Sequence, residues 1–330
     1  MKRLNLGLIG LGSQGRTHFR NCLRLKEAEL IAVADISKRN LHFAKRMGIK
    51  NTYTNYEDLL KDERIQAVVI CLPNFLHLES VVKAAEARKD IFLEKPLARN
   101  VEEGEEILSN VRRTGVKVMI GYDFRFNPVL RRLHEKIVGG FFGEVQIVHT
   151  ANMSQGPFSA KSTDVGPKAV PQWWFDKELV GGGALNDLGS HLVDLLMWYF
   201  GEVVDARSYL KHMFNMEFED SATCMLRFKN GPLATMNVGW FSKDLVQSIQ
   251  VCGTANNVSV CMAPQSRLHL ICGDIKKRLH QFTDDPYYAE LRYFAECLRR
   301  DVNPTPSAED GLSGLQVISA AYRNAHELTE

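Results

Sequence analysis

The chain has 330 residues, of which 45% are hydrophobic and 24% are charged, and its 41 basic and 39 acidic side chains leave a formal net charge of +2. Because a globular domain usually takes about 100 to 200 residues, we expect two domains. A near-neutral chain without a block of Lys and Arg argues against nucleic acid or an anionic membrane as a partner. The longest apolar runs, residues 67–72 and 192–200, are much shorter than the roughly 20 residues of a bilayer span.

The seven cysteines are an odd number, lie far apart and include no C-x-x-C pair. A disulfide framework or a structural zinc site requires closer, paired spacing. We therefore expect reduced thiols, no metal and a cytoplasmic location. The basic and apolar start of the chain, residues 2–10, is expected to belong to the mature protein, because no small-residue cleavage pattern follows it.

The first third of the chain alternates short β-branched runs with segments of helical periodicity. The predicted strands are residues 4–10, 30–34, 67–72, 91–93 and 116–121, and the predicted helices include residues 18–25, 76–87 and 101–114. Strands and helices that alternate in this way predict a parallel sheet covered on both faces.

After Pro128 the pattern changes to one helix followed by runs of period-two alternation. These runs, residues 145–151, 222–228, 234–241 and 246–251, predict an antiparallel sheet. The Gly-, Ser- and Pro-rich stretch 154–171 is too long for a passive connector and is typical of a lid or binding loop. Two helices, residues 287–300 and 308–327, close the chain, and Ser307 is the expected N-cap of the second.

A glycine-rich turn follows the first predicted strand. Gly10-Leu11-Gly12-Ser13-Gln14-Gly15 matches G-x-G-x-x-G, and Asp35, at the end of the next strand, follows Gly15 by 35 − 15 = 20 residues. In this context the motif predicts a dinucleotide site, in which the phosphates bind free N–H groups at the helix start and the carboxylate accepts hydrogen bonds from ribose hydroxyls.

Asp35 also bears on the type of cofactor. Its carboxylate would repel a 2′-phosphate, which favours NAD over NADP. Lys38 and Arg39 follow closely, and they can either contact such a phosphate or form a solvated helix start. NAD is therefore the expected cofactor, and NADP stays open.

Glu94-Lys95-Pro96 follows a buried-looking strand, at the sheet edge where open α/β folds bind ligands. The ammonium group of Lys95 can hydrogen-bond a substrate oxygen, and a cis peptide bond at Pro96 would aim it. The alternative is an ordinary surface lysine in a turn.

A run of three glycines at residues 181–183 leads into a predicted helix that contains Asp187 and His191. Because the two residues are four apart, they share one helix face. A carboxylate one turn from an imidazole can orient it as a general base that takes a proton from an alcohol. The alternative is a structural Asp–His pair, and Asp194 is more consistent with a structural role.

Together these segments resemble the glucose–fructose oxidoreductase/inositol dehydrogenase (Gfo/Idh/MocA) family over essentially the whole chain. The matching stretches are Gly10 to Gly15, residues 56–60, residues 71–77 (Cys-Leu-Pro-Asn-Phe-Leu-His), Glu94-Lys95-Pro96, Gly121-Tyr122, Arg125-Phe126-Asn127-Pro128, residues 181–194 and residues 306–311.

The resemblance implies an N-terminal α/β Rossmann domain and an α+β C-terminal domain whose large, open, mostly antiparallel sheet mediates dimers or tetramers. It implies a catalytic triad of Lys95, Asp187 and His191. The positions that it implies for cofactor binding are Gly10, Gly12, Ser13, Gln14, Gly15, Asp35, Leu72, Pro73, Asn74, His77, Glu94, Lys95, Pro96 and Arg125, with Glu94 near the nicotinamide ribose.

The chain departs from the family pattern before the triple glycine, where many relatives have Trp-Arg and this sequence has Gln172-Trp173-Trp174-Phe175-Asp176. The two tryptophans can stack on a sugar ring or anchor the long loop. Asn186 replaces a usual aliphatic residue and can contact a hydroxyl or cap something locally. The expected substrate-contacting residues are Lys95, Tyr122, Trp173, Trp174, Asn186, Asp187 and His191.

The sequence thus predicts a cytoplasmic NAD-dependent dehydrogenase that oxidises a secondary hydroxyl of a sugar, cyclitol or sugar derivative, or reduces the corresponding ketone. Alternatives are a redox-neutral enzyme that recycles bound NAD, and a non-catalytic NAD-responsive regulator. The expected partners are a small-molecule substrate and identical subunits in a dimer or tetramer. The expected boundaries are residues 1–121 for the Rossmann domain, 122–305 for the substrate-binding domain and 306–330 for a C-terminal helix that packs back toward the N-terminal domain.

Overall fold

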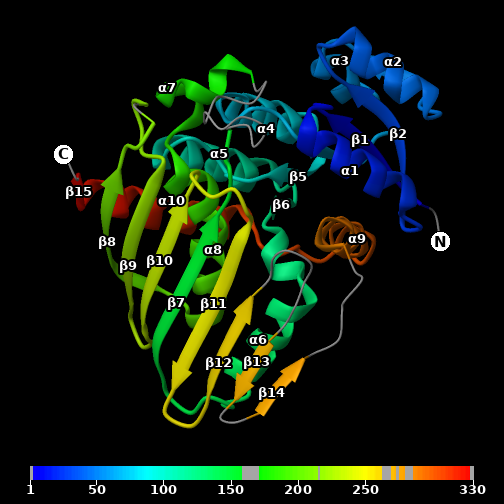
Figure 1. Cartoon of the computed structure of the whole chain (residues 1–330). Helices are drawn as coiled ribbons and strands as arrows, with labels where there is room; N and C mark the ends of the chain where they lie inside the picture. The colour runs from blue at the N-terminus through cyan, green and yellow to red at the C-terminus, as the bar shows by residue number, and fades with distance from the viewer. Residues whose placement is uncertain are drawn as a thin grey trace. The chain divides into compact units, whose positions relative to one another are not determined.

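The structure is a computed structural model that describes residues 3–157, 171–214, 216–261, 269–272, 275–278 and 285–327 (Figure 1). The chain forms two compact units. Unit 1 comprises Met1–Phe126 and Asp284–Ser313, and unit 2 comprises Asn127–Thr283 and Gly314–Glu330. Most of the predicted loop 154–171, namely residues 158–170, lies outside the described residues.

Unit 1 is built on a parallel six-stranded sheet with the strand order β3-β2-β1-β4-β5-β6. Its strands are β1 (Leu4–Ile9), β2 (Ala28–Ala34), β3 (Asn51–Tyr53), β4 (Ala67–Ile70), β5 (Asp90–Glu94) and β6 (Val118–Gly121). Its helices are α1 (Ser13–Arg24), α2 (Lys38–Arg46), α3 (Tyr56–Leu60), α4 (His77–Glu86), α5 (Val101–Thr114) and α9 (Pro286–Arg299), with short 3-10 turns η1 (Asn74–Leu76) and η2 (Asp123–Phe126). This order is that of a dinucleotide-binding Rossmann fold, as predicted.

Helix α5 shows how local sequence sets the ends of an element. The side chain of Asn100 caps its start by accepting a hydrogen bond of 2.9 Å from the N–H of Glu103. Gly115 ends it in the left-handed conformation, with φ of 72°, and donates its N–H to the carbonyl of Val111. The helix therefore spans the predicted residues, 101–114.

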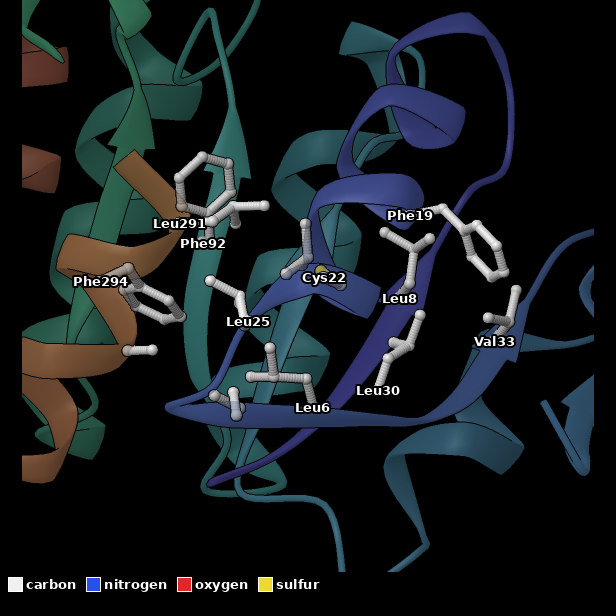
Figure 2. Close-up of a cluster of buried hydrophobic side chains, with 14 of the residues drawn as sticks. Leu6, Leu8, Phe19, Cys22, Leu25, Leu30, Val33, Phe92, Leu291 and Phe294 are labelled. Atoms are coloured by element: carbon white, nitrogen blue, oxygen red, sulfur yellow. The ribbon is translucent and has the colours of Figure 1, made fainter. Parts of the chain in front are cut away.

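Helix α9 completes the core of unit 1, although it follows unit 2 in the sequence. Leu291 and Phe294 are fully buried, and Figure 2 shows them beside Phe92 of β5 and Leu25, which follows α1. The ring centroids of Phe92 and Phe294 are 5.8 Å apart. The boundary predicted at residue 305 differs from this division, because the apolar face of α9 is buried against α1 and the parallel sheet.

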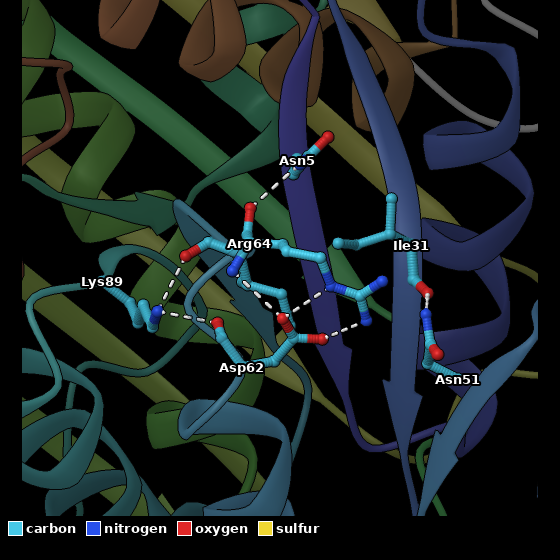
Figure 3. A network of polar contacts seen from close by, with 7 residues as sticks. Asn5, Ile31, Asn51, Asp62, Arg64 and Lys89 are labelled. Carbon is cyan, nitrogen blue, oxygen red and sulfur yellow. Dashed lines mark hydrogen bonds and ion pairs between the residues drawn. The ribbon is translucent and has the colours of Figure 1, made fainter.

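Polar contacts link the amino ends of the strands in unit 1 (Figure 3). Asn5 donates to the carbonyl of Arg64, and the ammonium group of Lys89 donates to the carbonyls of Asp62 and Ile65. A shallow polar hollow lies at the same edge, lined in part by Asn5 and Arg64. This edge is opposite to the one that holds the glycine-rich turn.

Unit 2 is built on a seven-stranded sheet with the strand order β12-β11-β7-β10-β9-β8-β15. Its strands are β7 (Val145–Met153), β8 (Val203–Lys211), β9 (Ser221–Phe228), β10 (Leu233–Gly239), β11 (Val246–Gly253), β12 (Asn257–Cys261) and β15 (Ala325–Glu327), and β13 (His269–Cys272) pairs separately with β14 (Ile275–Arg278). The pairs β7–β10 and β8–β15 are parallel, and the others are antiparallel. The prediction of a large, mostly antiparallel sheet is confirmed.

One face of this sheet is covered by α8 (Ala184–Phe200), which contacts β7, β9 and β10 and lies behind the strands in Figure 1. Burial alternates along β9 with a period of two, as expected for a strand with one covered face. The remaining helices of unit 2 are α6 (Pro128–Val138), α7 (Lys177–Val180) and the 3-10 turn η3 (Gln172–Phe175).

The last helix, α10, spans Ala308–Arg323, and its first residues belong to unit 1 and its last to unit 2. Ser307 caps it as predicted: its hydroxyl accepts from the N–H of Asp310, whose carboxylate accepts from the N–H of Ser307. The helix prediction was wrong at its end, because Ala325–Glu327 form β15 and pair with β8.

Among the described residues, every helix is too short or too polar to traverse a lipid bilayer.

The packing of α9 gives a stability prediction. Phe294→Ala should lower the free energy of unfolding by about 3 to 5 kcal/mol, because it removes a fully buried ring from the core. Chemical denaturation monitored by circular dichroism measures this change. Arg292→Ala, on the exposed side of the same helix, is the control and should change stability by less than about 0.5 kcal/mol. Equal effects of the two substitutions would contradict the placement of α9.

Candidate active site

The glycine-rich turn lies between β1 and α1, at the carboxyl end of the parallel sheet. Gly10 has a φ of 88°, which side chains disfavour, and a Cβ on Gly15 would lie 2.1 Å from the carbonyl oxygen of Gly10. Helix and strand therefore approach more closely than any other residue type allows. By contrast, a Cβ on Gly12 would meet nothing within 4 Å, so this glycine leaves open space beside the turn.

The start of α1 is arranged for an anion. Gly12 is its N-cap and provides no side-chain cap, and Ser13 and Gln14 are exposed in the first turn. The first N–H groups of a helix lack partners within the helix and carry its positive dipole end. This geometry fits the pyrophosphate of a dinucleotide.

Asp35 stands at the end of β2 and is fixed by the turn itself. One carboxylate oxygen accepts from the N–H of Leu11 at 2.6 Å, and the other accepts from the N–H of Ser37 at 2.7 Å. The amide of Asn40 adds a third hydrogen bond at 3.2 Å. A carboxylate can accept about four hydrogen bonds, so it retains capacity for a ribose hydroxyl. Lys38 and Arg39 are exposed at the start of α2.

The ends of β4 and β5 carry the next group of predicted residues. Leu72, Pro73 and Asn74 follow β4 and are half-buried. Glu94 ends β5, and Lys95 and Pro96 follow it, joined by a cis peptide bond. His77 connects the two segments: its ring nitrogens contact the carbonyls of Pro96 at 2.8 Å and Leu72 at 3.0 Å. Because the imidazole is fully buried, its pKa is lowered. Its contacts are with protein carbonyls.

Two predicted residues follow β6. Tyr122 is only 2% exposed, and Arg125 pairs with Asp310 at 3.3 Å. Asp310 belongs to the capping interaction at the start of α10. Arg125 is thus tied to the α10 N-terminus within unit 1.

In unit 2, Asp187 and His191 lie on successive turns of α8, and both are half-buried. The indole N–H of Trp240 donates to the Asp187 carboxylate at 3.3 Å. Trp240 follows β10 and is 1% exposed, so this hydrogen bond forms away from bulk water. The carboxylate that can orient His191 is itself oriented by a buried side chain.

The start of α8 is held by a buried carboxyl group. The side chain of Glu219 accepts from the N–H of Leu185 and from the hydroxyl of Tyr322, both at 2.8 Å, and its carbonyl accepts from the N–H of Ala184. Burial raises the pKa of Glu219. A Cβ on Gly183 would lie 1.8 Å from the Glu219 carbonyl oxygen, which explains why the segment before α8 contains glycine.

The predicted aromatic residues lie near this helix within unit 2. Trp173 and Trp174 are half-buried in η3 with ring centroids 5.5 Å apart, and Trp174 lies 6.3 Å from Trp240. Asn186 is 3% exposed and donates to the carbonyl of Val180. Its amide therefore makes the local contact that the sequence left as one of two options.

A buried polar cluster lies within unit 1, beside Glu94. The ring of His18, on α1, hydrogen-bonds the Glu94 carboxylate. A ring nitrogen of His18 and one carboxylate oxygen each of Glu94 and Glu290 lie within 4.8 Å of one another. Glu290 is on α9 and is fully buried. Burial, together with the nearby carboxylates of Asp123, Glu94 and Asp285, raises its pKa well above the ordinary value.

Sequence reasoning missed Trp240, Glu219, His18 and Glu290. Trp240 and Glu219 are far from Asp187 in sequence, and no local pattern links them to it. Glu290 did leave a signal, because it shares the helical stripe of Tyr287, Leu291 and Phe294 and is a charged residue among apolar ones.

Two family models match the chain. Residues 4–122 match one described as an oxidoreductase family with an NAD-binding Rossmann fold (GFO_IDH_MocA), and residues 130–259 match the GFO/IDH/MocA C-terminal domain. The chain belongs to the Gfo/Idh/MocA family. The resemblance predicted from the sequence is confirmed, and NAD is the cofactor of this oxidoreductase.

Individual members of the Gfo/Idh/MocA family agree with this assignment. An uncharacterized oxidoreductase of Rhizobium meliloti, ORF334, is 32% identical over 90% of each chain. Myo-inositol 2-dehydrogenase of Thermotoga maritima is 26% identical over 98% of this chain and 97% of its own. The structure of a levoglucosan dehydrogenase in complex with NADH superposes with a TM-score of 0.85 over 98% of this chain and 97% of that one at 21% identity, which shows the shared fold.

The open space at Gly12 gives a test of the NAD site in this family member. Gly12→Ala should weaken NAD binding by at least about ten-fold, because its methyl group would occupy the space through which the backbone approaches the pyrophosphate. Isothermal titration calorimetry measures the affinity. The melting temperature should stay unchanged, since nothing lies within 4 Å of the added carbon.

Gly15→Ala serves as the contrasting variant. It should lower the melting temperature, because its methyl group meets the Gly10 carbonyl. If Gly12→Ala bound NAD as tightly as the native protein, the placement of the pyrophosphate at this turn would be wrong.

Proposed function

We propose that this protein is an NAD-dependent dehydrogenase that acts on a secondary hydroxyl of a sugar, a cyclitol or a related polyol. The observation that supports this function most directly is the pair of Asp187 and His191 on successive turns of α8, with the carboxylate held by Trp240. The relative named myo-inositol 2-dehydrogenase supports the substrate class.

In the proposed mechanism, His191 takes the proton of the substrate hydroxyl as general base. Asp187 orients the imidazole and stabilises its charged form, and Lys95 donates a hydrogen bond to the same substrate oxygen while negative charge develops on it. Bound NAD supplies the hydride acceptor. Because the donor carbon must be held near van der Waals contact with the acceptor, positioning contributes much of the rate.

The cofactor residues divide along the sheet in this proposal. In a sheet of this strand order, a dinucleotide crosses the point where the order reverses, between β1 and β4. Asp35 on the β2 side then binds the adenosine ribose. The nicotinamide half lies over the ends of β4, β5 and β6, where Pro73, Asn74 and Glu94 are found.

We also propose that unit 2 mediates self-association through the open face of its sheet. On this face Ile147, Tyr209, Met225 and Leu233 are between 43% and 55% exposed. Ile147 and Leu233 are direct register partners on β7 and β10, so their apolar surfaces are adjacent. A second copy of the chain would cover this surface, which a monomer leaves in water.

The experiment that tests the function is the reduction of NAD, and separately of NADP, across inositols, aldoses, anhydrosugars and nucleotide sugars. We expect turnover with one substrate class and a higher kcat/KM with NAD, because Asp35 would repel a 2′-phosphate. Lys95→Ala should lower kcat by about 10³-fold and leave the affinity for NAD unchanged. Lys61→Ala, at an exposed lysine of unit 1, is the matched control.

Two outcomes would contradict the proposal. Near-native turnover by Lys95→Ala on a confirmed substrate would remove Lys95 from the mechanism. If folded protein that binds NAD turned over no substrate of the panel, the result would argue for a redox-neutral reaction instead.

The contact between Trp240 and Asp187 gives a second kinetic prediction. Trp240→Phe keeps a ring in the same buried position and removes the indole N–H. We expect kcat to fall by about ten-fold and the pH dependence of kcat to move to higher pH, because the Asp187 carboxylate loses a hydrogen bond that stabilises its ionised form. Trp198→Phe, at a tryptophan that stacks on His134 at the other end of α8, should leave kcat and the profile unchanged. An unshifted profile in Trp240→Phe would show that the hydrogen bond does not position Asp187.

A further inference from the structure

The cluster of His18, Glu94 and Glu290 concentrates negative charge in the interior of unit 1. Glu94 is 5% exposed, Glu290 is fully buried, and Asp123 of η2 is 7% exposed nearby. Among the described residues, neither carboxyl oxygen of Glu290 has a hydrogen-bond partner. An ionised carboxylate in such a place is costly, and proteins avoid the cost by protonating the group or by binding a cation.

The geometry favours a proton over a metal ion. His18 and Glu94 are in direct hydrogen-bond contact through the ring Nε2 and a carboxylate oxygen. A metal ion with ligands at about 2.0 to 2.1 Å holds its donor atoms roughly 3 Å apart or more, so a cation shared by these two groups would require that hydrogen bond to break. A proton on Glu290 requires no such change.

The acidic groups around Glu290 all act in the same direction. From the elements packed around it, the carboxylates of Glu94 on β5, Asp123 on η2 and Asp285 at the start of α9 disfavour its ionisation, as does burial. Tyr287 lies one turn earlier on α9, and Cys71 after β4 has a raised pKa caused by burial and by Glu94 and Glu290. His18 is the basic group of the cluster.

This cluster adjoins the half of the sheet that the proposed function gives to the nicotinamide. Glu94 ends β5, and its other carboxylate oxygen accepts from the N–H of Lys95 at 3.2 Å. The nicotinamide ring is positively charged in NAD⁺ and neutral in NADH. A positive charge beside Glu94 lowers the cost of ionising the carboxyl groups behind it.

We propose that Glu290 is protonated in the cofactor-free protein and releases this proton to solvent when NAD⁺ binds, so that the cluster favours the oxidised over the reduced cofactor. The O–H bond of the carboxyl group breaks, its electron pair stays on Glu290, and no oxidant or reductant is involved. NADH brings no positive ring and leaves Glu290 protonated. The inference rests on the proposed function through the position of the nicotinamide half.

The test is calorimetric titration of the full-length protein with NAD⁺ and with NADH, from about pH 5.5 to pH 9, in two buffers of different ionisation enthalpy. The buffer difference gives the number of protons exchanged. We expect NAD⁺ to bind with proton release and with an affinity that rises with pH. NADH should bind without that release and with an affinity that changes little.

Glu290→Gln is the variant that isolates the group, because an amide imitates the neutral acid in size and cannot ionise. It should abolish the extra proton release and weaken NAD⁺ binding at high pH by about ten-fold, which corresponds to one pKa unit of coupling, with NADH binding unchanged. Glu86→Gln, at an exposed carboxylate on α4, is the matched control and should behave as the native protein.

Stability provides a readout that does not depend on cofactor. A carboxyl group with a raised pKa in the folded state stabilises the fold below the ordinary Glu pKa and loses that contribution as pH rises toward the folded value. The melting temperature of Glu290→Gln relative to the native protein should therefore increase with pH across this interval.

Equal proton release with NAD⁺ and NADH in the native protein would overturn the inference, even if the variant failed to fold. So would proton release that persists in Glu290→Gln, or a stoichiometric metal ion in the purified protein that the variant lacks. Native protein that binds both nucleotides without this difference would leave the dehydrogenase proposal intact. Native protein that binds neither nucleotide would contradict that proposal as well.

Discussion

The carboxyl edge of the parallel sheet depends on two close approaches between backbones at the glycine-rich turn. Gly15 of α1 lies against the carbonyl of Gly10, and Gly10 itself lies against the carbonyl of Cys71 after β4, where a Cβ would be 2.4 Å away. Three segments, the ends of β1 and β4 and the first turn of α1, are thus brought together without side chains between them. Asp35 then accepts a hydrogen bond from the N–H of Leu11 within the same turn, so the carboxylate that we propose for the adenosine ribose is positioned by the glycine-rich turn.

Unit 2 holds its proposed catalytic residues by a different means. The start of α8 is held by the buried carboxyl group of Glu219, and Asp187 is held by Trp240. Both supporting residues come from segments beside the sheet strands rather than from α8 itself. The start of α8, just before Asp187 and His191, is therefore supported, which limits the fraying common at helix ends.

The sequence predicted those features that depend on near neighbours in the chain. The turn at Gly10 to Gly15, the bounds of α5 and the cap at Ser307 each follow from residues within one or two turns of one another. The alternation of strands and helices was enough to predict a parallel sheet covered on both faces. The period-two runs were enough to predict a mostly antiparallel second sheet.

The features that escaped prediction depend on distant partners. Residues 51–53 become β3 only by pairing with β2, and Ala325–Glu327 become a strand by pairing with β8, although their residue types continue a helix equally well. Helix α9 was expected in the substrate-binding domain and lies in unit 1, because nothing local shows that Leu291 and Phe294 pack with Phe92. Trp240 was missed for the same reason, since its importance comes from its contact with Asp187.

The division of the chain limits how the two units can be separated or exchanged by protein engineering. The polypeptide passes from one unit to the other three times, after Phe126, after Thr283 and after Ser313, and the third passage occurs inside α10. A fragment that ends at residue 126 would lack α9 and leave the apolar side of α1 and β5 in water. Exchange of substrate domains between relatives by a single crossover would likewise split both hydrophobic cores. Viable chimaeras of this architecture require coordinated junctions, and one of them must preserve an uninterrupted helix.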